Sequence, residues 1–340
     1  MDERIREAVR DEEAYVVGGA VRDQLLGRPV VDVDVACPSP ERSARRYARA
    51  IGGAPFPLSE RHGAWRVAFP DGSTVDFTPL RGSIEDDLRT RDFTVNAIAV
   101  PVSGGEPVDP LGGRADLAAR LLRAVGPTVF ADDPLRLLRA VRLEDELGLR
   151  LDPGTEELVR ANAGLAAAPA GERILGELLR LSVAGYRRAS ELGLLESLGG
   201  SEAGVGRFER VDSPEFRLVS ALEERIERLP ITNETRRYAR TLLRARPPED
   251  GSPRGIYRFR RATEPWALDA LAFVGATEYA DAVRAAREHE PKEPLLRGDE
   301  LGIPPGPEVG RLLALVAEER AAGTISTCEE ALALVRRERR

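Results

Sequence analysis

Two short motifs near the amino terminus constrain the fold of this chain more than any other feature. The pair Gly18-Gly19 lies between a predicted strand and a predicted helix, where backbone amides can approach phosphate oxygens. Asp32 and Asp34 follow on an apolar strand pattern, and their spacing places both carboxylates on one face of that strand. This order of motifs predicts a site that holds a nucleoside triphosphate by its phosphates and moves a nucleotidyl group with Mg²⁺.

Two further polar residues fit the same chemistry. Arg22, one turn into the predicted helix, can reach a phosphate held by the glycines, and Asp76, in a predicted strand over 73–78, can complete a carboxylate triad. Each feature alone has an ordinary explanation, because glycine pairs often precede helices and spaced aspartates often form the solvated face of an edge strand. The conjunction favours a metal site with Asp32 and Asp34 as ligands.

A second polar cluster is interleaved with apolar residues over 86–98. Asp92 and Asn96 need hydrogen-bond partners there, and one interpretation makes them capping or turn groups with a purely structural role. The other interpretation places both at the ribose of a bound nucleotide, with Arg91 nearby.

The segment over 132–142 combines an Asp-Pro helix start with an arginine stripe. Asp133 occupies a natural N-cap position before Pro134, and Arg136, Arg139 and Arg142 recur at a spacing of three. A capping aspartate and a solvated arginine face would explain this without any ligand. Alternatively, Asp133 accepts from the exocyclic amine of cytosine or adenine while Arg136 donates to the adjacent ring acceptor. Such a pair would select C and A without a nucleic-acid template.

Composition limits the class of protein. The chain has 340 residues, 42% of them apolar, a net charge of -7, and two cysteines, Cys37 and Cys328. Two isolated cysteines give no disulfide framework or zinc site, so any metal should have oxygen ligands. The negative charge argues against a general nucleic-acid coat, although clustered arginines can still bind phosphate locally. No stretch is apolar enough for a membrane span and the start lacks a signal-peptide layout, which predicts a cytoplasmic protein without membrane contact.

The predicted secondary structure changes along the chain. Strands are expected over 14–17, 30–36, 64–69 and 73–78 and helices over 21–26 and 41–51, with a hairpin at Pro70-Asp71-Gly72. Beyond residue 117 helical periodicity dominates, as in 134–147, 171–181, 215–228 and 309–321. The expected fold class is therefore α+β, a small-sheet head followed by an all-α arm.

Five segments, taken together and in order, resemble the class II tRNA nucleotidyltransferases, the CCA-adding family that also includes bacterial poly(A) polymerases. They are 18–34, 87–97, 109–113 with Asp116-Leu117, 132–142, and the motif Gly171-Glu172-Arg173-Ile174-Leu175-Gly176-Glu177-Leu178. The resemblance implies a nucleotidyltransferase head (1–126), a helical neck with a nucleobase-recognition helix (127–185), a helical body (186–255), and a helical tail that binds tRNA (256–340).

The resemblance also assigns roles to the candidate residues. The residues implied to bind the nucleotide fall into four groups. Gly18, Gly19 and Arg22 would contact the triphosphate, and Arg91, Asp92 and Asn96 would lie around the nucleotide. Asp133 and Arg136 would form the amino-acid template for the base, with Arg139 and Arg142 further along the same helix. The implied catalytic residues are Asp32 and Asp34, which bind Mg²⁺, and Asp76 as the third carboxylate.

The implied reaction is template-independent addition of C, C and A to the 3′ end of tRNA, from CTP and ATP, with release of pyrophosphate. The enzymes of this family grip the acceptor and T-stem region of tRNA. Departures from the family pattern are Thr90, where arginine is common, and Asp132, where glutamate is common. The short connection over 81–86 leaves a CC-only adding enzyme as an alternative, and a poly(A) polymerase is another. A catalytically silent RNA-binding protein and a small-molecule nucleotidyltransferase are the rivals from other classes.

Overall fold

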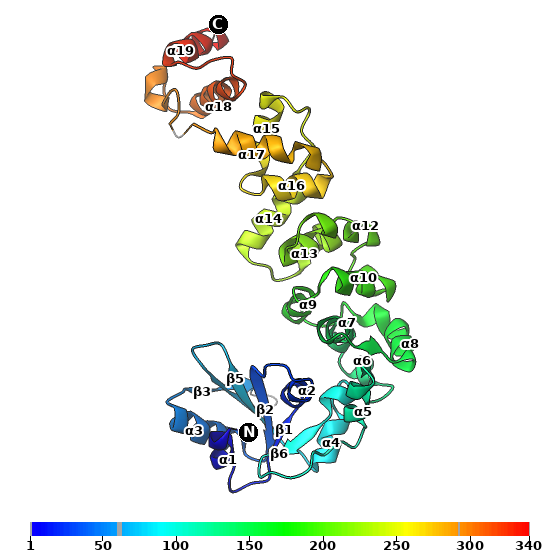
Figure 1. Cartoon of the computed structure of the whole chain (residues 1–340). Coiled ribbons are helices and arrows are strands. Elements are labelled where there is room, and N and C mark those ends of the chain that lie inside the picture. The colour runs from blue at the N-terminus through cyan, green and yellow to red at the C-terminus, as the bar shows by residue number, and fades with distance from the viewer. Residues whose placement is uncertain (1, 60–62, 292, 340) are drawn as a thin grey trace. The chain divides into compact units, whose positions relative to one another are not determined.

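The computed structural model describes residues 2–59, 63–291 and 293–339 (Figure 1). The chain divides into two compact units, Met1–Leu198 and Gly199–Arg340. A small sheet lies in the first unit and helices make up the second, which confirms the predicted α+β class. The finer division into head, neck, body and tail remains a prediction. Within the described residues, no helix is both long enough and apolar enough to cross a membrane.

A six-stranded sheet organises the head, with the strand order β3-β4-β5-β2-β1-β6. The strands β2 and β5 run parallel, whereas the other neighbouring pairs are antiparallel. The predicted hairpin is confirmed, because β4 and β5 pair antiparallel across the turn at 69–73. The strand bounds are β1 Tyr15–Val17, β2 Asp32–Cys37, β3 Pro55–Ser59, β4 Ala64–Ala68, β5 Thr74–Pro79 and β6 Ala99–Pro101.

The helix α3 (Pro40–Ile51) covers one face of this sheet. Its Tyr47 ring lies 5.8 Å from the Phe77 ring between centroids, and Val35 and Phe77 are fully buried beneath it. Because side chains alternate along a strand, the residues before these two, Asp34 and Asp76, point to the opposite face of the sheet. Burial of the apolar face thus leaves the carboxylates on the other face.

The other elements of the first unit precede the sheet, connect its strands or follow it. The helix α7 carries the arginine stripe, and its apolar side is fully buried through residues such as Leu137, Leu138 and Val141. The element bounds are α1 Glu3–Ala8, α2 Gly19–Leu25, α4 Ile84–Arg89, the 3₁₀ turn Thr94–Asn96, α5 Gly113–Ala118, β7 Leu121–Leu122, α6 Val129–Asp132, α7 Leu135–Leu147, β8 Arg150–Leu151, α8 Pro153–Asn162, α9 Gly171–Leu178, α10 Val183–Glu191 and α11 Leu194–Ser197.

The second unit contains separate hydrophobic clusters. One surrounds Phe259 and Leu271, and another, nearer the carboxyl terminus, surrounds Leu312 and Leu334. The element bounds are α12 Glu202–Val205, α13 Pro214–Leu222, α14 Asn233–Arg244, α15 Pro253–Thr263, α16 Ala267–Val274, α17 Ala280–Glu288, α18 Pro307–Ala321 and α19 Cys328–Glu338.

The structure corrects three details of the predicted elements. The edge strand β3 was not predicted, because Pro55 and Pro57 disfavour a strand everywhere except at a sheet edge, where β3 lies. The helix expected over 215–228 ends at Leu222, since Glu223 has a φ of 48° and a 3₁₀ stretch follows. Finally, a short parallel pair, β7 with β8, lies within the region predicted to be entirely helical.

Candidate active site

The glycine turn and the strand β2 meet at the start of α2. Gly18 precedes α2 with a φ of 71°, a backbone conformation that favours glycine. A Cβ at Gly18 would lie 3.4 Å from Asp34 Oδ2 and 3.6 Å from Arg91 Nη1. The structure therefore brings together three predicted site residues that are far apart in the sequence.

The aspartates form a carboxylate cluster on neighbouring strands. Asp34 is in register with Asp76 on β5, and Asp32 accepts a hydrogen bond from Thr74 Oγ1 at 2.7 Å. Burial raises the pKa of Asp34, and the negative charges of Asp76 and Asp32 raise this pKa further, against the opposing effect of Arg91 and Arg139. An ionised carboxylate at this position is therefore stabilised by an added cation.

Asp76 already has a cationic partner. Arg66 on β4 donates to both of its carboxylate oxygens, Nε to Oδ1 and Nη2 to Oδ2, each at 2.7 Å. Sequence reasoning missed Arg66, although a signal was present: Arg66 and Asp76 are equally distant in sequence from Asp71 in the turn, so a hairpin pairs them. The role of Asp76 as a third metal-site carboxylate stays a prediction.

The donor set fits a hard divalent cation that is shared with a substrate. Within residues 2–59, 63–291 and 293–339, no group of three or more acidic, histidine or cysteine side chains converges as a metal cage. Mg²⁺, however, is usually held by one or two carboxylates together with water and substrate phosphates. Asp32 and Asp34 provide two carboxylates on one strand face, and burial is the main cause of the raised pKa of Asp34.

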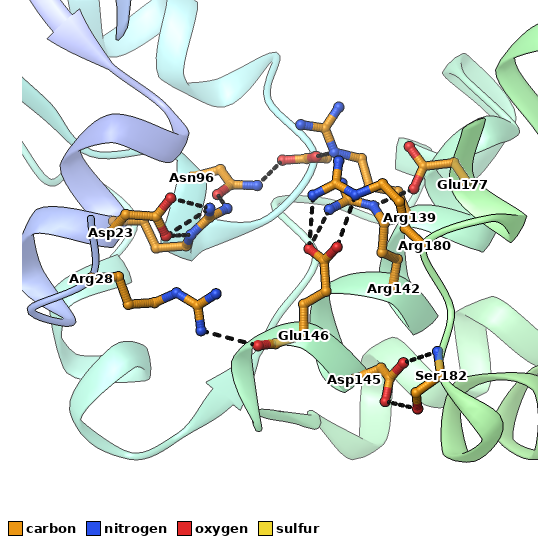
Figure 2. Close-up of polar contacts among 12 residues, drawn as sticks. Asp23, Arg28, Asn96, Arg139, Arg142, Asp145, Glu146, Glu177, Arg180 and Ser182 are labelled. Atoms are coloured by element: carbon orange, nitrogen blue, oxygen red, sulfur yellow. Dashed lines mark hydrogen bonds and ion pairs between the residues drawn. The ribbon is translucent and has the colours of Figure 1, made fainter. Parts of the chain in front are cut away.

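A continuous chain of polar contacts runs from α2 to α7. Arg22, which binds Asp23 through two hydrogen bonds of 2.9 Å, donates to Asn96 Oδ1 at 2.8 Å. Asn96 donates to Asp92 Oδ1 at 2.9 Å, and Asp92 Oδ2 lies 2.9 Å from Arg139 Nε in an ion pair. Figure 2 shows the two ends of this chain beside Asp23 and Arg139. Asp92 and Asn96 thus have the structural partners that the sequence required, and contact with a ribose stays a prediction.

The residues predicted to recognise the base lie at the start of α7. Arg136 donates to the backbone carbonyls of Thr90 at 2.9 Å and Val129 at 3.4 Å. The N-cap of α7 is Pro134 rather than the predicted Asp133, which lies one residue earlier and accepts from the amide of Leu135 and from Arg173 of α9. Arg136 contacts the backbone of Thr90 and Arg139 contacts the side chain of Asp92, so the two arginines bind the two neighbours of Arg91.

Arg142 is in a different environment from the other arginines of the stripe. Its side chain is only 7% exposed and pairs with Glu146, at 2.6 Å, and with Glu177 of α9 (Figure 2). These carboxylates raise the pKa of Arg142 against the opposing effect of burial. A direct contact between Arg142 and the nucleotide stays a prediction. Sequence reasoning missed both partners of Arg142, although the spacing of four residues to Glu146 on the same helix was a signal; Glu177 lies on another helix and gave none.

The variant Glu177→Gln should lower the melting temperature, because it weakens the pairing of a buried guanidinium. With Glu146 still in place, we expect a loss of about 1–2 kcal/mol in the free energy of unfolding. Thermal unfolding followed by circular dichroism measures the change. Glu172→Gln, an exposed residue of the same helix, is the matched control and should leave the melting temperature unaltered. Equal melting temperatures for both variants would contradict the prediction.

The connection between the sheet and α4 is short, as predicted. The strand β5 ends at Pro79 and α4 begins at Ile84, with the Ser83 hydroxyl accepting from the amide of Asp86 as its N-cap. Only residues 80–83 lie between these two elements.

Comparison with known proteins agrees with this architecture. Residues 14–83 and 71–123 match the family model described as the poly A polymerase head domain. Across the whole chain, the structure is similar to a solved CCA-adding enzyme in complex with ATP, with a TM-score of 0.82 and 21% identity over 100% of this chain and 97% of that one. It is also similar to the Thermotoga maritima CCA-adding enzyme complexed with tRNA, with a TM-score of 0.76 and 22% identity over 99% and 93% of the two chains.

The match to this head-domain model, together with the similar relatives, identifies a metal-dependent nucleotidyltransferase. Two relatives are similar over nearly their full length. The A-adding tRNA nucleotidyltransferase of Deinococcus radiodurans is 34% identical over 95% of each chain, and the CC-adding enzyme of Thermus thermophilus is 32% identical over 95% of this chain and 93% of its own. The chain belongs to the tRNA nucleotidyltransferase family, which confirms the resemblance and the transferase class predicted from its sequence.

Proposed function

We propose that this nucleotidyltransferase adds C, C and A to the 3′ end of tRNA, using CTP and ATP and no nucleic-acid template. The observation that carries the proposal is the contact of α7 with the segment around Arg91: Arg136 binds the Thr90 carbonyl and Arg139 binds Asp92. Arg91 in turn lies beside Gly18 and Asp34. Asp133 and Arg136, the pair suited to a base with an exocyclic amine, are therefore connected through the segment around Arg91 to the carboxylates suited to phosphate chemistry.

A relative with the full activity supports the same conclusion. The CCA-adding enzyme of Geobacillus stearothermophilus is 39% identical over 55% of this chain and 49% of its own. The preference for C and A follows from the acceptor on Asp133 and the donors on Arg136, which uracil and guanine would meet with the opposite polarity. A tRNA substrate agrees with the cytoplasmic location predicted from the sequence.

In the proposed mechanism, Asp32 and Asp34 hold divalent metal, for which we propose Mg²⁺. Bound there, the metal supplies positive charge to the triphosphate and to the oxygen that attacks it. The amides after Gly18 and the guanidinium of Arg91 orient the triphosphate. Arg22 donates hydrogen bonds to Asn96 and Asp23 and so fixes these side chains near the glycine turn. The 3′ hydroxyl of the tRNA loses its proton to water and attacks the α-phosphorus in line. The bond between the α-phosphorus and the oxygen that bridges it to the β-phosphate breaks, and pyrophosphate leaves.

The proposed function can be tested by reading product length at single-nucleotide resolution. Purified protein is incubated with Mg²⁺, CTP, ATP and two transcripts, one lacking the whole 3′ CCA and one ending in CC. We expect three additions to the first transcript and one to the second.

Other products would change the assignment. Two additions to the first transcript and none to the second would identify a CC-adding enzyme, and extension of the second alone would identify an A-adding enzyme. A long A tract would identify a poly(A) polymerase. Failure to extend either transcript would overturn the proposal in favour of an RNA-binding protein without activity.

A further inference from the structure

The motif over 171–178 has no role in the mechanism described so far. It forms α9, whose Arg173 and Glu177 lie one helical turn apart. Arg173 contacts Asp133 at the start of the base-recognition helix α7, and Glu177 contacts Arg142 further along it. Two charged residues of α9 thus contact the two ends of the predicted nucleotide-binding stretch of α7.

The contact between Arg173 and Asp133 engages both carboxylate oxygens. Arg173 Nη2 donates to Oδ2 at 2.8 Å and Nη1 donates to Oδ1 at 3.3 Å. Oδ1 also accepts from the amide of Leu135 at 3.2 Å. A planar guanidinium that binds two oxygens fixes the orientation of the carboxylate plane. Each oxygen has two acceptor positions, so Oδ2 keeps one for a further donor.

We propose that Arg173 is a positioning residue that sets base selectivity by holding Asp133 as an oriented acceptor. A carboxylate fixed in this way accepts a hydrogen bond from the exocyclic amine of C or A. With U or G it faces a carbonyl instead, and the carboxylate oxygen is left without a donor, which costs binding free energy. Without Arg173, the carboxylate can rotate away from a wrong base and the penalty falls. This inference rests on the proposed function, because it assigns Asp133 to base recognition.

The charge on Asp133 agrees with this role. Burial raises the pKa of Asp133, but the hydrogen bonds from Arg173 and Leu135 and the charges of Arg173 and Arg136 outweigh that effect, so its pKa is lowered. The carboxylate is therefore held in the form that only accepts hydrogen bonds.

The packing of α9 does not depend on this contact. Ile174 and Leu178 are buried, and the second contact of α9, Glu177 with Arg142, remains without Arg173. Beyond the end of α9, Arg180 binds Glu146 of α7 as well (Figure 2). Removal of Arg173 should therefore leave the protein folded.

The test compares Arg173→Met with the wild-type enzyme in single-nucleotide addition to a tRNA transcript lacking its CCA end. The measured quantity is the ratio of kcat/KM for CTP to kcat/KM for UTP, which we expect to fall roughly tenfold, the effect of one charge-assisted hydrogen bond. Arg173→Lys, which keeps the charge but not the two-point contact, should recover part of the ratio. In an Asp133→Ala background, Arg173→Met should have no further effect.

The matched control is Arg160→Met. Arg160 and its partner Glu156 on α8 have side-chain exposures of 48% and 29%, close to the 49% and 31% of Arg173 and Asp133. This control should keep the wild-type ratio. An unchanged ratio in Arg173→Met, or an equal change in both variants, would overturn the inference.

The inference can fail separately from the proposed function. If wild-type protein adds no nucleotide, the proposed function fails, and calorimetric binding of CTP and UTP then tests Arg173. A wild-type preference for CTP binding that Arg173→Met loses would support the inference, and equal preferences in the two proteins would overturn it.

Discussion

Replacing Asp34 with asparagine is expected to reduce nucleotide addition by roughly 1,000-fold or more, because a metal contribution of several kcal/mol to the transition state would be lost. The same variant should melt no lower than wild type in the presence of a chelator. Asp34 faces Asp76 across β2 and β5, and burial together with the neighbouring carboxylates disfavours its charge. Removing that charge therefore relieves the costs of burial and repulsion, which outweigh its attraction to Arg91 and Arg139.

The measurements are single-turnover addition to a tRNA lacking its CCA end and thermal unfolding in EDTA. Asp71→Asn is the control, because Asp71 is an exposed aspartate in the turn that follows β4, where it accepts hydrogen bonds from Ser73. It should keep wild-type activity. Substantial activity in Asp34→Asn would refute the metal assignment, and a lower melting temperature would refute the argument from repulsion.

The largest effect on stability is expected for Gly113→Ala. A Cβ at Gly113 would lie 2.1 Å from the carbonyl oxygen of Thr94 and 2.9 Å from Ile98 Cγ1. Backbone cannot yield as a flexible side chain can, so the 3₁₀ turn that carries Asn96 must move. We expect a loss of about 3 kcal/mol in the free energy of unfolding. Activity should also fall, because a displaced Asn96 cannot hold both Arg22 and Asp92.

Urea unfolding monitored by circular dichroism, together with the addition assay, measures both effects. Gly126→Ala is the control, because a Cβ there meets no atom of the described structure within 4 Å and the residue has no left-handed φ. It should change the free energy of unfolding by less than about 0.5 kcal/mol. Equal stability of the two variants would show that α5 can move away from the turn at no cost.

Local sequence patterns predicted most of the head. The alternation of aspartate and valine over 30–36 located β2 and its carboxylate face, and the turn at Pro70-Asp71-Gly72 located the hairpin. A strand that contains Pro55 and Pro57 was not predictable, because its stability comes from pairing with β4 rather than from its own residues. The bend after α13 was also missed, since the left-handed φ of Glu223 has no signal in residue type.

The candidate site was predictable in its members but not in their pairing. Polar groups that need partners, such as Asn96 and Asp92, could be identified from the apolar run around them. The two residues bind each other, but their further partners, Arg22 and Arg139, lie on helices distant in sequence. Periodicity carries no information about which side chains meet between elements. Arg173 is an example: its motif could be identified from the sequence, but its contact with Asp133 is visible only in the structure.

The polar chain from Asp23 to Arg139 also limits how freely this enzyme can exchange parts with its relatives. A chimaera joined near residue 126 would take Asp92 from one parent and Arg139 from the other, so the two must match for the ion pair to form. Arg28 makes a second contact across this position, a hydrogen bond to the backbone carbonyl of Glu146, which any residue at 146 can accept (Figure 2). A chimaera joined at this position therefore keeps the ion pair only when one parent supplies an aspartate at 92 and the other an arginine at 139.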